Sequence, residues 1–226
     1  MWIGRCEERT SHRGAILPVN DEFDASERFA IEFVQLTESG LLFEGPVDQL
    51  SSDPFYGVPV RSATDGVVVA IGGGRFAFYA HLIPGLRVVV GDRVRAGVNV
   101  LGRLGNSGNS DAPHLHFHVM DGRGPLSSNG LPFVFDAEIG VEGTVTNLIG
   151  ISAGDPVELD TSSAGDFQGR LPLDLQLVDF GGNRRSGTRC VEDFVETATV
   201  WRARITTARG RARPAEPRLD TPFLSS

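Results

Sequence analysis

Short runs of apolar, β-branched and aromatic residues alternate with glycine-rich turns through the middle of the chain. Such runs, bounded by Gly, Pro, Asn or Asp, are typical of short β-strands joined by tight turns. Strands are expected at residues 66–71, 75–80, 86–90 and 114–119. Helical periodicity is scarce, and its best candidate is a short piece at residues 191–205. The pattern therefore predicts a mainly β fold with a mostly antiparallel core.

The density of this pattern divides the 226 residues into four parts. A β domain is expected at residues 14–136, preceded by an N-terminal extension at residues 1–13. Short apolar runs and Gly/Ser-rich linkers at residues 137–182 predict peripheral strands lying on that core. The pattern then fades, so residues 183–226 are expected to form a basic, flexible and disordered tail.

The net charge of −8 is unevenly placed along the chain. Residues 184–226 hold nine arginines and five acids, a net +4, which leaves −12 on residues 1–183. Because nucleic-acid binders are more often basic, nucleic acid is not expected as a partner. The chain has no run of 18 apolar residues, so no transmembrane segment is expected. No apolar signal-peptide core is visible at its N-terminus, which leaves open a cytoplasmic protein, a gene start further upstream or another export route.

The chain contains no lysine, so all 21 basic residues are arginine. Schiff-base chemistry, the P-loop lysine and the biotin or lipoyl carriers each require an ε-amine and are excluded. This removes the carrier-domain interpretation of the ribbon at residues 91–102. Cys6 and Cys190 have no CxxC partner, so a thiolate metal site is not expected, and whether they pair stays open.

Three of the five histidines lie within five residues, at His114, His116 and His118. Alternate side chains of a strand share one face at a spacing of roughly 6 to 7 Å, so two imidazoles can approach one metal ion or one water. The turn-rich segment 104–113 would deliver this strand to an exposed edge of the sheet. The triplet alone slightly favours the polar face of a half-exposed strand, because histidine is tolerated on solvated strands.

The wider sequence around these histidines resembles the lysostaphin-type, or LytM-like, zinc metallopeptidases, which are peptidoglycan endopeptidases. The resemblance covers roughly residues 14–135 and rests on the order and spacing of several segments. These are Gly57–Val60, Asp65–Ala70, Tyr79–Leu82, Val90–Gly97 and Gly105–Val119.

This resemblance implies a twisted antiparallel β-sheet of the lysostaphin type, similar to a duplicated hybrid motif, whose floor holds a zinc ion. It implies that His116 binds the zinc and that His81 and His114 are catalytic residues. Their implied roles are to take a proton from the attacking water and to steady the oxyanion of the tetrahedral intermediate. The implied partners are peptide stems or cross-bridges of peptidoglycan, in the cell envelope or outside the cell. The sequence gives no oligomeric state.

The chain departs from the family at the early His-x-x-x-Asp motif, which supplies the other two zinc ligands. Arg28 stands where the histidine belongs, and Glu32 replaces the aspartate. Glu32 can still bind zinc through oxygen, whereas a guanidinium stays protonated and has no lone pair. A third ligand could come from His118 or from His12. Without either, Arg28 and Glu32 are expected to form an ion pair that fills the vacated site.

A second departure lies between Ala70 and Phe76, where one strand of the family is expected to be missing or fused.

Three functions of this chain stay open. The first is a zinc endopeptidase of peptidoglycan, weakened by an incomplete ligand set. The second is a catalytically inactive relative that binds wall peptide or a partner hydrolase. The third, an intracellular β domain with an unrelated ligand, rests only on the missing signal peptide.

Overall fold

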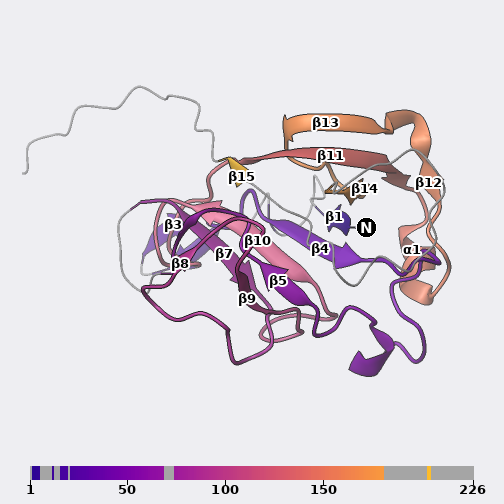
Figure 1. Cartoon of the computed structure of the whole chain (residues 1–226), viewed down its shortest axis with the longest axis horizontal. Coiled ribbons are helices and arrows are strands. Elements are labelled where there is room, and N and C mark those ends of the chain that lie inside the picture. Colours follow the sequence, from indigo (N-terminus) through magenta and orange to yellow (C-terminus); the bar gives the residue numbers. More distant parts are fainter. Residues whose placement is uncertain are drawn as a thin grey trace, which may run out of the picture.

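Strands account for most of the secondary structure in the computed structural model, which describes residues 2–5, 12, 16–19, 21–68, 74–180 and 203–204 (Figure 1). In chain order the strands are β1 (Trp2–Arg5), β2 (Leu17–Val19), β3 (Glu22–Asp24), β4 (Ile31–Gln35), β5 (Pro59–Arg61), β6 (Gly66–Val67), β7 (Phe76–Ala80), β8 (Arg93–Val94), β9 (Val100–Arg103), β10 (Leu115–Met120), β11 (Val134–Val145), β12 (Leu159–Asp160), β13 (Gly165–Arg170), β14 (Gln176–Asp179) and β15 (Ala203–Arg204). Every strand pairing within these residues is antiparallel, which confirms the mainly β fold class predicted from the sequence.

Helical structure is sparse in the described part of the chain. It comprises the helix α1 (Leu148–Ala153) and the short 3₁₀ turns η1 (Leu50–Ser52) and η2 (Thr161–Ser163). No helix among the described residues is long and apolar enough to cross a lipid bilayer.

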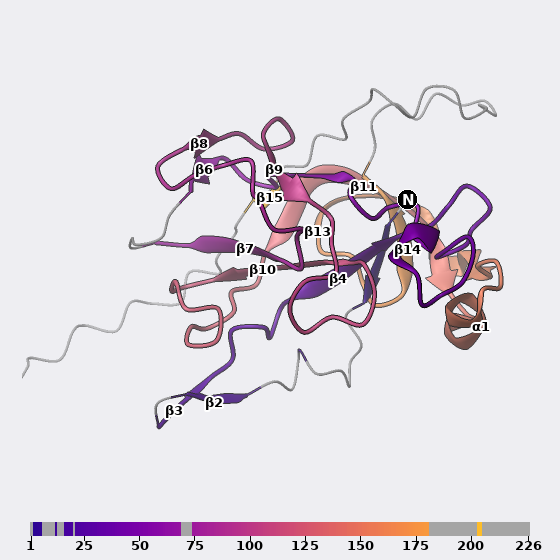
Figure 2. The same cartoon turned by 90° about the horizontal axis from the view of Figure 1, so that it is seen from below.

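A nine-stranded sheet organises the described residues, in the order β12-β11-β14-β1-β4-β10-β7, with β13 and β15 also paired to β11. Three two-stranded sheets accompany it, β2 with β3, β5 with β9 and β6 with β8. The β2–β3 hairpin projects away from the main sheet, on the opposite side from β6 and β8 (Figure 2). The large sheet thus joins strands from both ends of the described chain.

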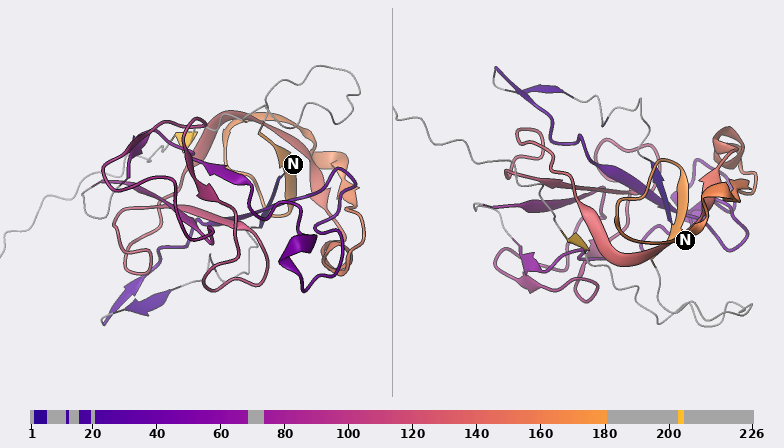
Figure 3. Two further views of the ribbon diagram at one scale, coloured as in Figure 1. Left: turned by 60° about the horizontal axis from the view of Figure 1, so that its bottom comes forward. Right: turned by 90° about the horizontal axis from the view of Figure 1, so that it is seen from above.

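The strand β11 curves strongly where it crosses the molecule (Figure 3). Its register shifts against β13 between Phe135 and Glu138 and against β14 between Val141 and Gly143. Such irregularities bend a strand and increase its twist. The bend lets the strands of residues 134–180 continue the same sheet as β4 and β10.

The strand β10 lies inside the main sheet, hydrogen-bonded to β4 on one side and to β7 on the other. The expectation that its loop delivers it to an exposed edge is therefore wrong, because β7 takes the edge position. Alternation along β10 sends Leu115, Phe117 and Val119 into the main hydrophobic core. The opposite face carries His116 and His118, so the core fixes which face the histidines occupy.

Aromatic rings fill much of that core. Phe117 meets Phe133 edge-on with ring centroids 5.2 Å apart, and Phe135 meets Phe180 in the same way at 5.1 Å. All four side chains are at most 3% exposed. Burying each one stabilises the fold by about 1.5–3 kcal/mol relative to leaving it in water.

Two expected strands are confirmed, since β7 lies within residues 75–80 and β10 overlaps residues 114–119. Of the strand expected at residues 66–71, β6 covers the start. Residues 69–73 lie outside the described residues, and with them the strand expected to be missing there. The helix expected at residues 191–205 also lies outside them, except for the two residues of β15, which are extended instead.

The expectation of a strand at residues 86–90 is wrong. A turn closes there, in which Asp92 N–H donates to the Val89 carbonyl at 3.1 Å and the Asp92 carboxylate accepts from Val89 N–H at 2.9 Å. The side chains of Val89 and Val90 are exposed. A β-branched run becomes a strand only where a neighbouring strand can pair with it, and the local turn prevails here.

Candidate metal centre

Glu32 and His116 lie directly opposite each other on the paired strands β4 and β10. The Glu32 side chain is 16% exposed, and a hydrogen bond of 2.7 Å joins its Oε1 to Nδ1 of His116. Side chains at opposite positions of an antiparallel pair share one face and can touch. The two metal ligands expected from the sequence are thus brought together by strand register.

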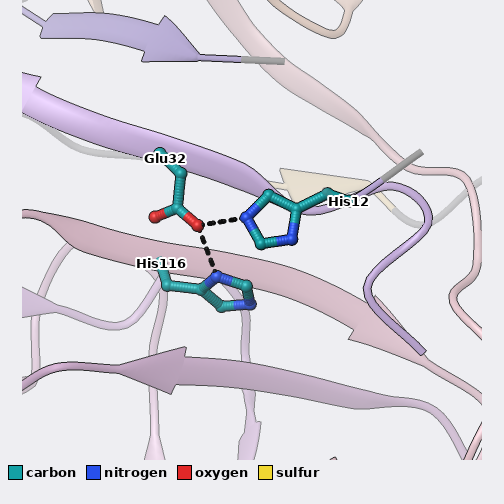
Figure 4. Close-up of side chains that lie close together, drawn as sticks. All are labelled: His12, Glu32 and His116. Carbon is teal, nitrogen blue, oxygen red and sulfur yellow. Dashed lines mark hydrogen bonds and ion pairs between the residues drawn. The ribbon is translucent and has the colours of Figure 1, made fainter. Parts of the chain in front are cut away.

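His12 reaches the same carboxylate oxygen from a segment outside the main sheet (Figure 4). Its Nε2 lies 2.6 Å from Oε1 of Glu32, and its ring centroid lies 5.1 Å from that of His116 at an interplanar angle of 70°. One ligand atom from each of the three residues lies within 4.8 Å of the other two. Two imidazoles and a carboxylate therefore converge on one point.

His118 occupies a different position from the one a third ligand would need. Its Nδ1 lies 2.8 Å from Nε2 of His116, on the side of that ring away from Glu32. The side chain is fully buried, and its Nε2 has no hydrogen-bond partner among the described residues. Of the two candidates for the third ligand, the geometry favours His12.

Arg28 lies outside the cluster. Its side chain is exposed and lines a surface hollow with Ala25, Phe29 and Asn129. Within the described part of the chain it makes no ion pair with Glu32, whose ion-pair partners are histidines. The ion pair expected to fill the vacated site is thus not formed. An exposed guanidinium keeps its hydration, which it would lose beside the buried carboxylate.

His81 and His114 stand beside the cluster, with ring centroids 4.4 Å apart. His114 Nε2 lies 2.9 Å from Oε2 of Glu32, although that oxygen accepts no well-aligned hydrogen bond. The other nitrogen of each ring is fixed by a backbone carbonyl. His81 Nδ1–H donates to Ser107 at 2.7 Å, and His114 Nδ1–H donates to Ala112 at 2.8 Å. These bonds occupy Nδ1 of each ring, so Nε2 is the nitrogen that can exchange a proton, and in His114 it faces Oε2 of Glu32.

Charges within the cluster shift several pKa values. Hydrogen bonds to Glu27 and Glu32 raise the pKa of His12 to about 9. Burial alone would raise the pKa of Glu32, but its contacts with three imidazoles outweigh burial and hold that pKa far below its usual range. Burial alone would lower the pKa of His114, but its contact with the Glu32 carboxylate outweighs burial and raises that pKa.

The two histidines without a carboxylate contact shift the other way. Burial lowers the pKa of His118 to about 4, assisted by the charge of His116. Burial also lowers the pKa of His81, although the Ser107 carbonyl opposes this. The cluster thus contains imidazoles with a raised pKa, His12 and His114, and imidazoles with a lowered pKa, His81 and His118.

The donor set fits a zinc ion. Two imidazole nitrogens and one carboxylate oxygen form a ligand set of catalytic zinc sites, in which a fourth position stays open. Zinc-binding histidines commonly have their second ring nitrogen held by another group. Here His12 Nδ1 lies 3.0 Å from Oε2 of Glu27, and His116 Nε2 contacts His118. Both imidazole rings therefore have such a partner.

Sequence patterns indicated most of this site but not all of it. His81, His114, His116 and Glu32 were expected there, and the fold brings all four together. His12 was one of two open candidates and falls in the expected N-terminal extension. Glu27 was not recognised. Its position five residues before Glu32 gave no periodic signal, because residues 26–29 form a turn.

Comparison with known proteins gives matches to one family. Residues 51–128 match the model of peptidase family M23, a span that includes His81, His114 and His116. The glycyl-glycine endopeptidase ALE-1 of Staphylococcus capitis is 33% identical over 106 residues, which cover 39% of this chain and 29% of that protein. The chain therefore spans less than a third of the length of that curated relative.

Two solved structures are also similar to this chain, with TM-scores below 0.5. The catalytic domain of the antimicrobial peptidase lysostaphin from Staphylococcus simulans is 24% identical, covers 50% of this chain and 80% of its own, and has a TM-score of 0.31. The catalytic domain of the prophage-encoded M23 protein EnpA from Enterococcus faecalis is 20% identical, covers 56% and 85% respectively, and has a TM-score of 0.33.

Proposed function

Since the chain is a divergent member of the lysostaphin-type family of metallopeptidases, we propose that it is a zinc-dependent endopeptidase that hydrolyses peptide bonds in bacterial peptidoglycan. The substrates would be peptide stems or cross-bridges. The convergence of His12 Nε2, His116 Nδ1 and Glu32 Oε1 gives this function its strongest support.

His12, Glu32 and His116 would hold the zinc ion in this proposal. When bound, zinc supplies Lewis acidity that polarises the scissile carbonyl and makes water more acidic. Glu32 brings the negative charge that two neutral imidazoles lack. The backbone of β4 and β10 holds Glu32 and His116 in place, so these two donors need little reorganisation before they bind.

His81 and His114 are the proposed catalytic residues. Both have Nδ1 bonded to a backbone carbonyl, which fixes the ring orientation and leaves Nε2 as the nitrogen that exchanges protons. One ring, neutral at Nε2, would accept a proton from the attacking water. The other, protonated at Nε2, would donate a hydrogen bond to the oxyanion. Their ring centroids lie 4.4 Å apart, and His114 Nε2 lies 2.9 Å from Oε2 of Glu32, which supports this assignment.

Metal content and wall cleavage test this function together. Protein purified without added zinc should hold close to one zinc per chain and release peptides from purified peptidoglycan. His116→Ala should lose both the zinc and the cleavage, because it removes a ligand. His114→Ala should keep the zinc and lose cleavage by about 100-fold or more, because it removes only a proton-handling group. Glu38→Ala, at an exposed carboxylate, is the control.

A second candidate is a catalytically inactive relative that binds wall peptide or a partner hydrolase. The replacement of a family ligand by Arg28 favours it. It predicts wild-type protein that sediments with peptidoglycan while it holds no zinc and releases no peptide. That result would rule out the enzyme.

A further inference from the structure

A turn just before β4 separates the side chains of Glu27 and Arg28. The turn is closed by hydrogen bonds from Arg28 N–H to the Ala25 carbonyl at 3.2 Å and from Ala30 N–H to the Glu27 carbonyl at 2.8 Å. Arg28 is exposed, whereas the Glu27 side chain is 26% exposed and contacts the cluster. The turn therefore sends residue 28 outward and residue 27 inward.

The turn is also anchored to the loop after β10. Gly130 N–H donates to the Ala25 carbonyl at 2.9 Å, and a Cβ at position 130 would lie 2.5 Å from the backbone oxygen of Ser26. Ser26 is fully buried. The backbone that carries Glu27 is thus held in place. A side chain that orients another group must itself be fixed in this way.

Each ring nitrogen of His12 contacts a different carboxylate. Nε2 contacts Glu32 at 2.6 Å, and Nδ1 contacts Glu27 at 3.0 Å. An ionised carboxylate only accepts, so both ring nitrogens donate when no metal is bound. A metal that displaces the Nε2 proton leaves Nδ1–H donating to Glu27 and the lone pair on Nε2. Nε2 is the nitrogen that faces Glu32 and His116. Glu27 thereby selects the tautomer that a metal at this point needs.

We infer that Glu27 is a positioning residue that makes His12 a metal ligand, and that the pair His12–Glu27 replaces the ligand that the family places at position 28. This inference rests on the proposed function. A histidine at position 28 would be carried by the same turn as Glu27. The replacement ligand comes from a segment sixteen residues earlier (28 − 12), so it needs a partner to hold its ring. A carboxylate on the second nitrogen orients the ring and raises its basicity.

Zinc affinity measured by competition with a chromogenic chelator tests the inference without relying on activity. Glu27→Ala should weaken zinc binding by about 10–100-fold, as loss of an outer carboxylate partner does elsewhere. Glu27→Gln keeps a hydrogen-bond acceptor and should lose less. Glu22→Ala removes an equal charge from the exposed strand β3 and should leave the affinity unchanged.

A double-mutant cycle separates positioning from simple attraction between Glu27 and the ion. If Glu27 acts through His12, Glu27→Ala should have no further effect on zinc affinity in a His12→Ala background. Cobalt substituted for zinc adds a spectroscopic readout. Its visible absorption should change in His12→Ala, where a ligand is lost. Circular dichroism of each metal-free variant shows that it is folded.

Two results would overturn the inference while the proposed function stands. One is an equal loss of affinity from Glu27→Ala in the presence and absence of His12. The other is zinc affinity and cobalt absorption in His12→Ala that match the wild type. A wild-type chain that takes up no zinc is a distinct result, and it would overturn the proposed function and the inference with it.

Discussion

A single carboxylate, Glu32, contacts three imidazoles, and this determines what the site can bind. Its Oε1 faces His12 and His116, and its Oε2 faces His114. A buried anion is costly unless it is paired. The three imidazoles supply that pairing, and a divalent cation would supply it more fully. Arg28 adds nothing to this balance, because its side chain faces solvent.

The exposed position of Arg28 gives a prediction for the variant that restores the family residue. Arg28→His should leave the zinc content of the wild type unchanged and should not restore zinc to a His12→Ala protein, because the turn directs residue 28 away from Glu32. Metal analysis of the single and double variants measures this. Recovery of zinc in the double variant would mean that the turn can present residue 28 inward, contrary to the geometry described.

A site residue could be identified from the sequence where it lies on a regular strand or in a motif of fixed spacing. His116 alternates with core residues on a strand, and Glu32 belongs to a motif of fixed spacing, so both could be expected. His12 could not be chosen over His118 from the sequence, because no periodicity links residue 12 to the sheet. Glu27 contributes through a contact 15 residues apart in sequence, which local patterns do not encode.

The segment between β9 and β10 packs closely against the backbone that carries His81. A Cβ on Gly105 would lie 2.6 Å from the Ile83 nitrogen and 2.7 Å from the His81 carbonyl oxygen. His81 itself has φ of 60°, a strained conformation for a residue with a side chain. The Ser107 hydroxyl donates to the Leu82 carbonyl at 2.7 Å. Glycine at position 105 therefore permits the approach that orients His81.

Gly105→Ala should lower peptidoglycan cleavage by about 100-fold while the zinc content stays at the wild-type level. The added methyl group displaces the backbone at His81, and a shift of about 1 Å at this proposed catalytic residue can cost that much. Gly66→Ala is a matched control, since its Cβ would meet only the Thr64 hydroxyl at 4.0 Å. Loss of zinc together with activity in Gly105→Ala would contradict this assignment.

A strand could be predicted where its apolar and polar residues alternate and a neighbouring strand pairs with it. β7 and β10 satisfy both conditions, and their positions were expected. The run at residues 86–90 has the composition of a strand, but a turn closed by Asp92 prevails. The interior position of β10 could not be seen either. It depends on pairing with β4, which lies about 80 residues away in sequence.

At the scale of the whole molecule, one sheet connects distant parts of the chain. β1, at residues 2–5, lies between β4 and β14, although these residues were expected to form an extension. β11 and β14 bring Phe135, Ile139 and Val178 into the same core as Phe117 of β10. The strand that carries His116 is therefore supported by residues from well beyond the segment 51–128 that matches the family.

Phe135→Ala should lower the free energy of unfolding by about 3–5 kcal/mol, because it empties a fully buried aromatic position. Denaturant unfolding of the chelated protein measures this. Phe23→Ala serves as the control, since that side chain is 77% exposed and its loss should change stability by less than about 0.5 kcal/mol. Similar values for the two variants would show that the core does not extend to β11.

The pairing of β10 on both edges also limits how this protein can evolve. A strand that slips by one residue turns every side chain to the opposite face. On β10 such a slip would place Phe117 in the metal cluster and His116 in the hydrophobic core, so stability and ligand position must change together. His12 lies outside this sheet and is free of that constraint. A lineage can therefore exchange the proposed third ligand while His116 stays fixed.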